Sequence, residues 1–99
     1  MKVRFSDAAL GDLRRIGDYI AQDSPLRARD FVRALRERAM QLADNPLAFP
    51  LVPRHEHSGI RRRVFRGYLI FYQVEANTIS IVRILHGARD YEAVLFADE

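Results

Sequence analysis

The apolar positions in the first half of the chain follow two spacings. Val3 and Phe5 alternate with charged residues, which predicts a short strand over 2–5. Helical spacing then predicts one helix over about 7–22 and a second from 25 to about 44, carried by Leu10, Leu13, Ile16, Ile20, Ala28, Phe31, Leu35, Ala39 and Leu42. Polar residues, among them Asp12, Arg15 and Asp18, lie largely between the apolar positions of the first helix. Ser6 and Ser24 precede the helices as N-caps, so we expect a helical hairpin with one apolar side.

The second half has the patterning of strands. Prolines interrupt 45–59, which predicts a loop, and the β-rich runs 60–66, 68–75 and 78–86 follow. A turn is expected at Ala76–Asn77, where Asn tolerates positive φ, and Gly87 is expected to stop the last strand. The run 68–74 is apolar on both alternating faces, which is typical of a strand covered on both sides or of one whose outer face binds a partner.

These elements define one fold class. The order β-α-α-β-β-β is α+β, with a helical hairpin packed on an antiparallel sheet and a possible short C-terminal helix over 90–96. The 99 residues form one domain, 1–99, because their 48% hydrophobic content suffices for a single core. The start of the chain has no signal-peptide pattern and no apolar run could span a membrane, so we expect a cytoplasmic protein.

The composition and motifs argue against several classes of catalytic and metal site. The chain has no cysteine, which excludes disulfides, thiolate metal sites and cysteine nucleophiles. His55–Glu56–His57 offers two imidazoles without a third ligand, and no serine or glycine lies in a nucleophile-elbow or phosphate-loop pattern. We therefore expect no metal and no cofactor.

The charge is concentrated in arginine. Of 16 basic residues only Lys2 is lysine, and 54–89 holds seven arginines against Glu56 and Glu75, followed by an acidic tail with Asp90, Glu92, Asp98 and Glu99. The planar guanidinium group of arginine binds carboxylate or phosphate, so this block indicates an acidic partner, either nucleic acid or protein. The alternative is a strand face that is simply exposed to solvent.

Two alternating sets stand out within the block. Arg61 and Arg63 share one strand face, as do Tyr68, Ile70 and Tyr72. Arginine and tyrosine on a sheet could grip RNA or anchor a protein interface, and the tyrosines could equally pack in the core. His86, near the end of a strand, could be a general acid or base or a structural hydrogen-bonding residue.

Several segments in order carry a family resemblance. They are 9–16, 19–21, Ser24–Ala28, Asn45–Pro46, Gly59–Arg62, Gly67–Val74 and Ile81–Asp90. With these segments the chain resembles the RelE/ParE superfamily of type II toxin–antitoxin toxins, and more closely its ParE branch. The resemblance implies a cognate antitoxin, ParD-like or other, whose C-terminal segment wraps over the helical hairpin and sheet in a hetero-oligomer. An exposed apolar central strand and an arginine-rich face would suit such a segment.

The superfamily implies two activities. RelE-like members cut mRNA in the ribosome without a metal, using basic residues on the second strand, an Arg after the Gly-Tyr of the central strand, an Arg after the last strand and a C-terminal Tyr. Here Leu69 follows Gly67–Tyr68, and Tyr91 comes a turn early. If the chain were such an RNase, its catalytic residues would be Arg61, Arg63, His86 and Arg89.

ParE-like members lack that set and are implied to inhibit DNA gyrase by binding it, which is not an enzymatic activity. We expect no membrane association, and the resemblance implies no direct DNA binding by the toxin itself. We expect the strand 61–66 and the stretch after His86 to form the target face, and the target- or antitoxin-binding residues to be Arg61, Arg62, Arg63, Arg66, Tyr68, Tyr72, Arg83 and Arg89. A toxin fold that binds its antitoxin but has lost its target is a further alternative.

Overall fold

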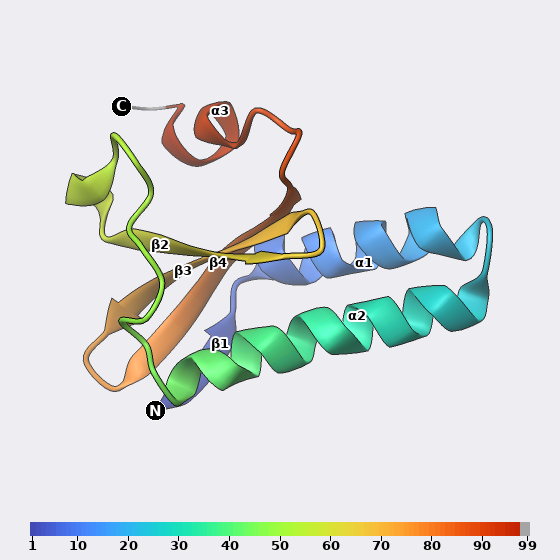
Figure 1. The fold of residues 1–99 in the computed structure, drawn as a ribbon, viewed down its shortest axis with the longest axis horizontal. Coiled ribbons are helices and arrows are strands. Elements are labelled where there is room, and N and C mark those ends of the chain that lie inside the picture. The colour runs from blue at the N-terminus through green and yellow to red at the C-terminus, as the bar shows by residue number, and fades with distance from the viewer. Residues whose placement is uncertain (98–99) are drawn as a thin grey trace.

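The chain folds into a helical hairpin, a four-stranded sheet and a short C-terminal helix (Figure 1). The computed structural model describes residues 1–97, so Asp98 and Glu99 of the acidic tail lie outside the described residues. The elements are β1 (Lys2–Phe5), α1 (Asp7–Ala21), α2 (Pro25–Met40), β2 (Ile60–Phe65), β3 (Tyr68–Glu75), β4 (Thr78–His86) and α3 (Tyr91–Phe96), with 3₁₀ turns at Gln41–Ala43 and Glu56–Ser58. The predicted α+β fold and its element order are confirmed.

Serine caps begin the two long helices. The Ser6 Oγ accepts a hydrogen bond from the Ala9 backbone N–H at 3.0 Å, and its hydroxyl donates to the Val82 carbonyl at 2.8 Å. The Ser24 Oγ accepts from the Arg27 N–H at 3.2 Å. Helix α2 ends at Met40, before the predicted 44, because its last turn tightens into the 3₁₀ segment.

The sheet is mixed rather than purely antiparallel. Its order is β1-β4-β3-β2, and β2, β3 and β4 pair antiparallel as predicted. Strand β1 pairs with β4 in parallel, with Val3 opposite Ile79. Alternating apolar and charged residues over four positions do not indicate whether the neighbouring strand runs parallel or antiparallel. The sequence therefore could not predict the parallel pairing of β1 at the edge of the sheet.

Both turns between the antiparallel strands contain residues with positive φ, and in one of them the residue differs from the expected one. Arg66 and Gly67 have φ of 48° and 83°, as a two-residue hairpin turn between right-twisted strands requires. In the β3–β4 turn, Ala76 rather than Asn77 takes the positive φ, at 44°. The sequence identified this turn but not the residue that bends it.

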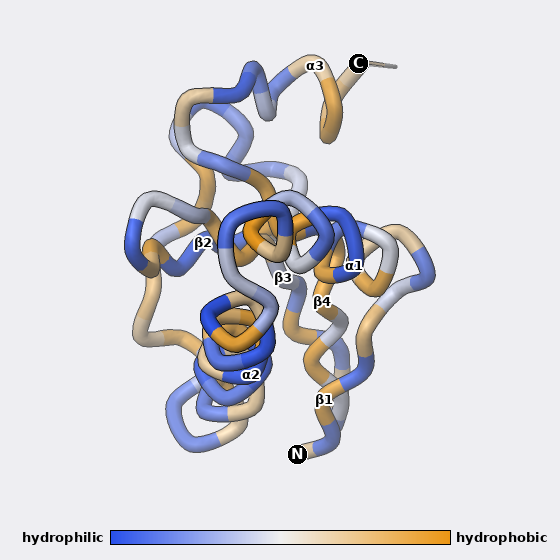
Figure 2. The backbone as a smooth tube through the Cα atoms, turned by 90° about the vertical axis from the view of Figure 1, so that its right-hand side faces the viewer, coloured by the Kyte–Doolittle hydropathy of each residue, from blue (hydrophilic) through white to orange (hydrophobic). Residues whose placement is uncertain are grey.

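Two apolar clusters cover the two faces of β3. The cluster on the helical side joins the hairpin to the sheet through residues including Leu13, Leu35, Ile70, Tyr72 and Ile81. The opposite cluster contains Val52, Ile60, Leu69, Phe71, Leu85 and Phe96, beneath α3 and the 51–60 segment. Figure 2 shows mainly hydrophobic residues along β3 and β4, whereas β1, β2 and α2 alternate between hydrophobic and hydrophilic residues.

The double-sided apolar pattern of 68–74 therefore reflects burial on both sides. Leu69 is 7% exposed, and Ile70, Phe71 and Tyr72 are fully buried. The expectation of an exposed apolar central strand that receives the antitoxin is wrong for residues 69–72. Among residues 1–97, no helix has the length and apolarity needed to cross a membrane.

Candidate functional site

The arginines of β2 divide between the two faces of the sheet. The Arg61 guanidinium donates to the Phe49 carbonyl at 2.8 Å, and the Arg63 guanidinium donates to the Arg38 carbonyl at 3.0 Å. Arg62 points the other way and donates to the Tyr91 hydroxyl at 2.8 Å. The prediction that Arg61 and Arg63 share one face is confirmed. Because side chains alternate along a strand, Arg62 lies on the other face, so the residues predicted as one target face are divided between two.

Tyr72 is not a surface residue. Its side chain is fully buried beneath the helical hairpin, and its hydroxyl donates to the Pro46 carbonyl at 2.8 Å. Burial raises the pKa of the phenol, although Arg61, a backbone hydrogen bond and Arg63 act in the opposite direction. The expectation that Tyr72 contacts a target or antitoxin is wrong, because the residue has no exposed surface.

Arg83 has an internal partner instead of an external one. Its Nε and terminal nitrogen donate to both carboxylate oxygens of Asp12 at 2.8 Å. Asp12 is 3% exposed and also accepts from the Ile84 N–H and from Arg15, both at 2.9 Å. Arg83 therefore joins α1 to β4, and the expectation that it also contacts a partner stays a prediction.

The sequence analysis missed Asp12. It was placed among the polar residues between the apolar positions, yet it lies three residues after buried Ala9 and four before buried Ile16. Those offsets place a residue on the same helix face. The available signal was a carboxylate among the apolar positions of a helix, together with a single arginine, Arg83, inside the β-rich run 78–86.

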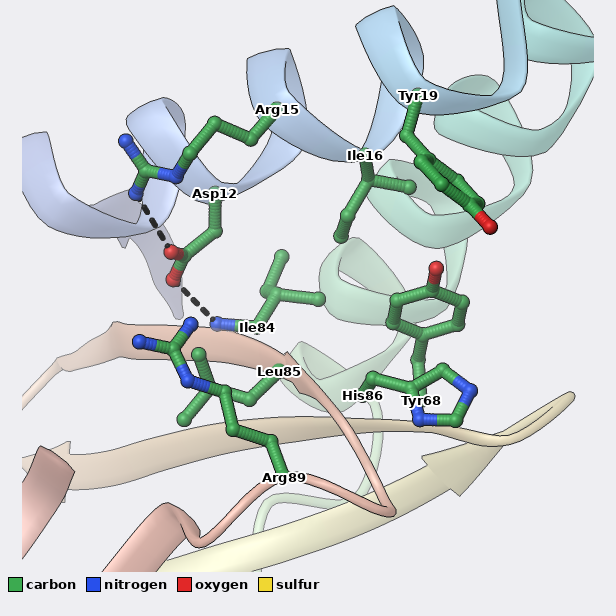
Figure 3. A pocket seen from close by; sticks show the side chains of 9 residues that line it. All are labelled: Asp12, Arg15, Ile16, Tyr19, Tyr68, Ile84, Leu85, His86 and Arg89. Atoms are coloured by element: carbon green, nitrogen blue, oxygen red, sulfur yellow. Dashed lines mark hydrogen bonds and ion pairs between the residues drawn. The ribbon is translucent and has the colours of Figure 1, made fainter. Parts of the chain in front are cut away.

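A cavity of about 190 Å³ opens at the end of β4 (Figure 3). It is lined by Asp12, Arg15, Ile16, Tyr19, Tyr68, Ile84, Leu85, His86 and Arg89. The ring of Tyr68 meets His86 edge-on, with centroids 5.1 Å apart. In Figure 3 the guanidinium groups of Arg15 and Arg89 lie at one end of this cavity and the rings of Tyr19, Tyr68 and His86 at the other.

The cavity brings together only some of the predicted residues. Tyr68, His86 and Arg89 line it, whereas Arg61 and Arg63 do not. In the register Tyr68 lies opposite His86, while Arg61 lies opposite Tyr72, four residues further along β3. At about 3.3 Å per residue, roughly 13 Å of strand separates Arg61 from the cavity.

A backbone hydrogen bond sets the tautomer of His86 in this cavity. The Ala88 N–H donates to Nδ1 of His86 at 3.1 Å, so the neutral ring carries its proton on Nε2. That nitrogen then presents a donor rather than a lone pair. Burial raises the pKa of the Tyr68 phenol, and the nearby Tyr19 raises it further. The cavity therefore offers hydrogen-bond donors and cations, which suit an anionic group.

Helix α3 is fixed over the opposite face by side chains of the loop before β2. Glu92 accepts from Arg54 at 2.9 Å and pairs with His55 Nε2 at 2.8 Å. Hydrogen bonds from His55 and then Arg54 lower the pKa of Glu92. The His55 ring also stacks on Phe96 at 3.9 Å, and no group of three or more potential metal ligands occurs in residues 1–97.

Comparison with known proteins places this arrangement in a family. Residues 3–91 match the family described as ParE toxin of type II toxin–antitoxin system, parDE. The chain is 39% identical to Toxin RelE2 of Caulobacter vibrioides over 82 residues, which cover 82% of this chain and 89% of that protein.

Two solved structures share the fold. One is from the chromosomal ParDE toxin–antitoxin system of P. aeruginosa, with a TM-score of 0.74 and 22% identity over 87% of this chain and 95% of the other. The second is from the toxin–antitoxin complex RelBE2 of Mycobacterium tuberculosis, with a TM-score of 0.65 and 26% identity over 86% and 95%. The sequence, the fold and these matches agree, and the chain belongs to the ParE toxin family of type II toxin–antitoxin systems.

Proposed function

We propose that this toxin inhibits DNA gyrase by direct binding, without catalysis, and is neutralised by a cognate antitoxin. The observation that carries the proposal is the dispersal of the residues an RNase would need. Arg61 and Arg63 are bound to backbone carbonyls beside α2, while His86 and Arg89 line the cavity at the end of β4. Arg61 lies about 13 Å and Arg63 about 7 Å along the strand from the level of the cavity. Both guanidinium groups are directed at backbone carbonyls, so the four residues do not converge on one reacting phosphodiester.

Leu69 gives further support. The RNase branch of the superfamily is implied to have arginine at this position, which follows Gly67–Tyr68. Here the side chain packs with Val52 and Phe71 under α3 and is 7% exposed. The position therefore contributes to the core instead of supplying charge to a phosphate.

The state of His86 also supports a binding role. A general base needs an unprotonated nitrogen directed at the substrate. Because Nδ1 of His86 accepts from the Ala88 N–H, the neutral ring has only an N–H to offer at Nε2. This arrangement suits anion binding better than removal of a proton from a 2′-hydroxyl.

The antitoxin is expected on the outer side of the helical hairpin. An open groove of about 480 Å³ runs there, with Leu10, Leu13 and Val32 among its lining residues and with Arg14, Arg29 and Arg36 beside them. Apolar contacts flanked by arginines suit an acidic amphipathic segment. The solved relatives are described as belonging to a ParDE system and a RelBE2 toxin–antitoxin complex, which supports an antitoxin partner here.

The deciding experiment is pulse-labelling of DNA and protein synthesis in bacteria immediately after this gene is induced alone. We expect thymidine incorporation to fall first while amino-acid incorporation continues, and purified protein to inhibit gyrase supercoiling. Arg61→Glu and Arg63→Glu should reduce both effects in protein shown to be folded by circular dichroism. Arg33→Glu, an exposed change on α2, alters the charge as much as each single variant and is the matched control for both. Intact toxicity in folded Arg61→Glu/Arg63→Glu protein would remove the β2 arginines from the target face.

A second candidate function is ribosome-dependent mRNA cleavage. It is favoured by the relative named Toxin RelE2 and by the presence of His86 and Arg89 in one cavity. In that case amino-acid incorporation would collapse first, and His86→Gln or Arg89→Gln would restore growth. Unchanged growth with soluble protein present would indicate a toxin fold without a target.

A further inference from the structure

Five arginines on α2, on β2 and in the turn after β2 are linked through shared contacts, and we call them the arginine stripe. Its members are Arg27, Arg38, Arg61, Arg63 and Arg66. Arg63 donates to the Arg38 carbonyl at 3.0 Å, and the guanidinium groups of Arg38 and Arg66 lie over the same Phe65 ring, at 4.8 and 5.0 Å. Arg66 and Arg27 then line one cavity of about 420 Å³. Only the 61–66 portion of the stripe is visible as a run in the sequence.

The stripe is held in place by contacts that leave its charge available. Arg63 lies over the Phe49 ring at 4.8 Å, and Arg61 donates to the Phe49 carbonyl. A guanidinium group has five N–H donors, and stacking on a ring uses none of them. Such fixed cations lose little further side-chain entropy when an anion binds.

Among residues 1–97, no carboxylate forms an ion pair with an arginine of the stripe. Within residues 1–97, ion pairs engage Arg15, Arg29, Arg54 and Arg83, and none engages a stripe arginine. Asp30 lines the cavity with Arg27 and Arg66, but its carboxylate lies 3.6 Å from Arg29. Burial lowers the pKa of Arg63, and the charge of Arg38 lowers it further. Like charges held this close favour an incoming polyanion.

We propose that the arginine stripe binds the phosphodiester backbone of a nucleic acid without reading its sequence. An acidic protein segment would need open apolar surface beside the charges, and along Arg38, Arg61 and Arg63 the rings of Phe49 and Phe65 are already covered by guanidinium groups. Apolar side chains line the stripe at its Arg27–Arg66 end, where Ile20, Phe31 and Tyr68 share a cavity with these two arginines. A larger set of apolar side chains lines the hairpin groove, among them Leu10, Leu13 and Val32. Several unpaired cations along one surface, most of them stacked on rings that they cover, fit a chain of phosphates. This differs from the resemblance, which implies no direct DNA binding, and it does not depend on the gyrase proposal.

The test measures binding of the purified chain to a short fluorescent DNA duplex of arbitrary sequence over a range of salt concentrations. Neutralised phosphates release counterions, so the logarithm of the binding constant falls with the logarithm of salt by about 0.9 per contact. Arg27→Gln/Arg38→Gln/Arg66→Gln should reduce that slope by about 2.7. The matched control, Arg14→Gln/Arg29→Gln/Arg36→Gln, removes the same charge from the hairpin groove and should leave the slope nearly unchanged.

Parallel measurements identify the ligand and can overturn the proposal. An RNA duplex of the same sequence shows which nucleic acid is preferred, and tighter binding of either one supports the stripe. Equal losses in the two triple variants would overturn it, because affinity would then follow net charge alone. Loss of binding to a glutamate-rich peptide, with nucleic-acid binding retained, would also overturn it. Thermal unfolding of both variants shows that each is folded.

Discussion

Asp12 on α1 and Arg83 on β4 form a two-pronged ion pair, with both carboxylate oxygens accepting at 2.8 Å across 71 residues of sequence. The carboxylate is 3% exposed, and the Arg83 side chain is 20% exposed. The pair binds the helical hairpin to the strand that lies between β1 and β3. It is thus a structural connection, although both residues have the chemistry of a binding site.

Removing one partner of this pair should destabilise the fold strongly. Asp12→Ala leaves Arg83 partly buried without its carboxylate, and we expect the free energy of unfolding to fall by about 3–5 kcal/mol, measured in urea. Replacing both, as Asp12→Leu/Arg83→Met, should recover most of that loss because no unpaired charge remains. A double variant as unstable as Asp12→Ala would show that packing, rather than charge, limits this site.

Stability should fall in acid through the same carboxylate. Burial alone would raise the pKa of Asp12, but hydrogen bonds from Arg83, the Ile84 N–H and Arg15, together with the charge of Arg83, lower it below its ordinary 3.8. The unfolded chain therefore binds the proton first, and the stabilisation is present above about pH 4 and is lost as pH falls through the folded pKa. Urea unfolding between pH 2 and 6 should show a shallower decline for Asp12→Asn than for the unchanged protein. Parallel curves would assign the acid sensitivity to other carboxylates, such as Glu92.

The two serine caps should differ in their contribution to stability. Ser6→Ala removes both the acceptor for the Ala9 N–H and the hydroxyl donor to Val82, so we expect a loss of about 2 kcal/mol. Ser24→Ala removes only the acceptor for Arg27 and should cost about 1 kcal/mol. Urea unfolding of the two variants makes the comparison, and equal losses would mean that the Ser6–Val82 contact adds nothing.

Helix α3 should detach before the rest of the protein unfolds. Phe96 is 9% exposed and stacks on His55, so Phe96→Ala removes the main apolar contact of a six-residue helix. Hydrogen exchange should accelerate in 91–97 while β3 and β4 stay protected. Tyr91→Phe, which removes only the acceptor for Arg62, should have a smaller effect on the same amides. Uniform acceleration throughout the sheet would show that α3 belongs to the globally cooperative core.

Local patterns were sufficient to predict the elements but not the partners of charged residues. Helical spacing and the Ser6 and Ser24 caps gave both helices, and the double-sided run 68–74 indicated a covered strand. Whether an arginine faces solvent or a carboxylate depends on residues far away in the sequence, as Arg83 and Asp12 demonstrate. The same limit hid Arg27 and Arg38: Arg38 meets the other stripe arginines through Phe65 and its own carbonyl, and Arg27 does so through the cavity that it shares with Arg66.

The parallel pairing of β1 with β4 has a consequence for synthesis in the cell. Lys2 to Phe5 align with Thr78 to Ile81, so β1, the first strand to be synthesised, has no partner until β4 has been made. The carboxylate of Asp12 likewise has neither Arg83 nor the Ile84 N–H until those residues have been translated. Because contacts between distant segments form late, a growing chain holds an unpaired strand and an unmatched charge until β4 has been made. The chain can therefore acquire this fold only after β4 has been translated.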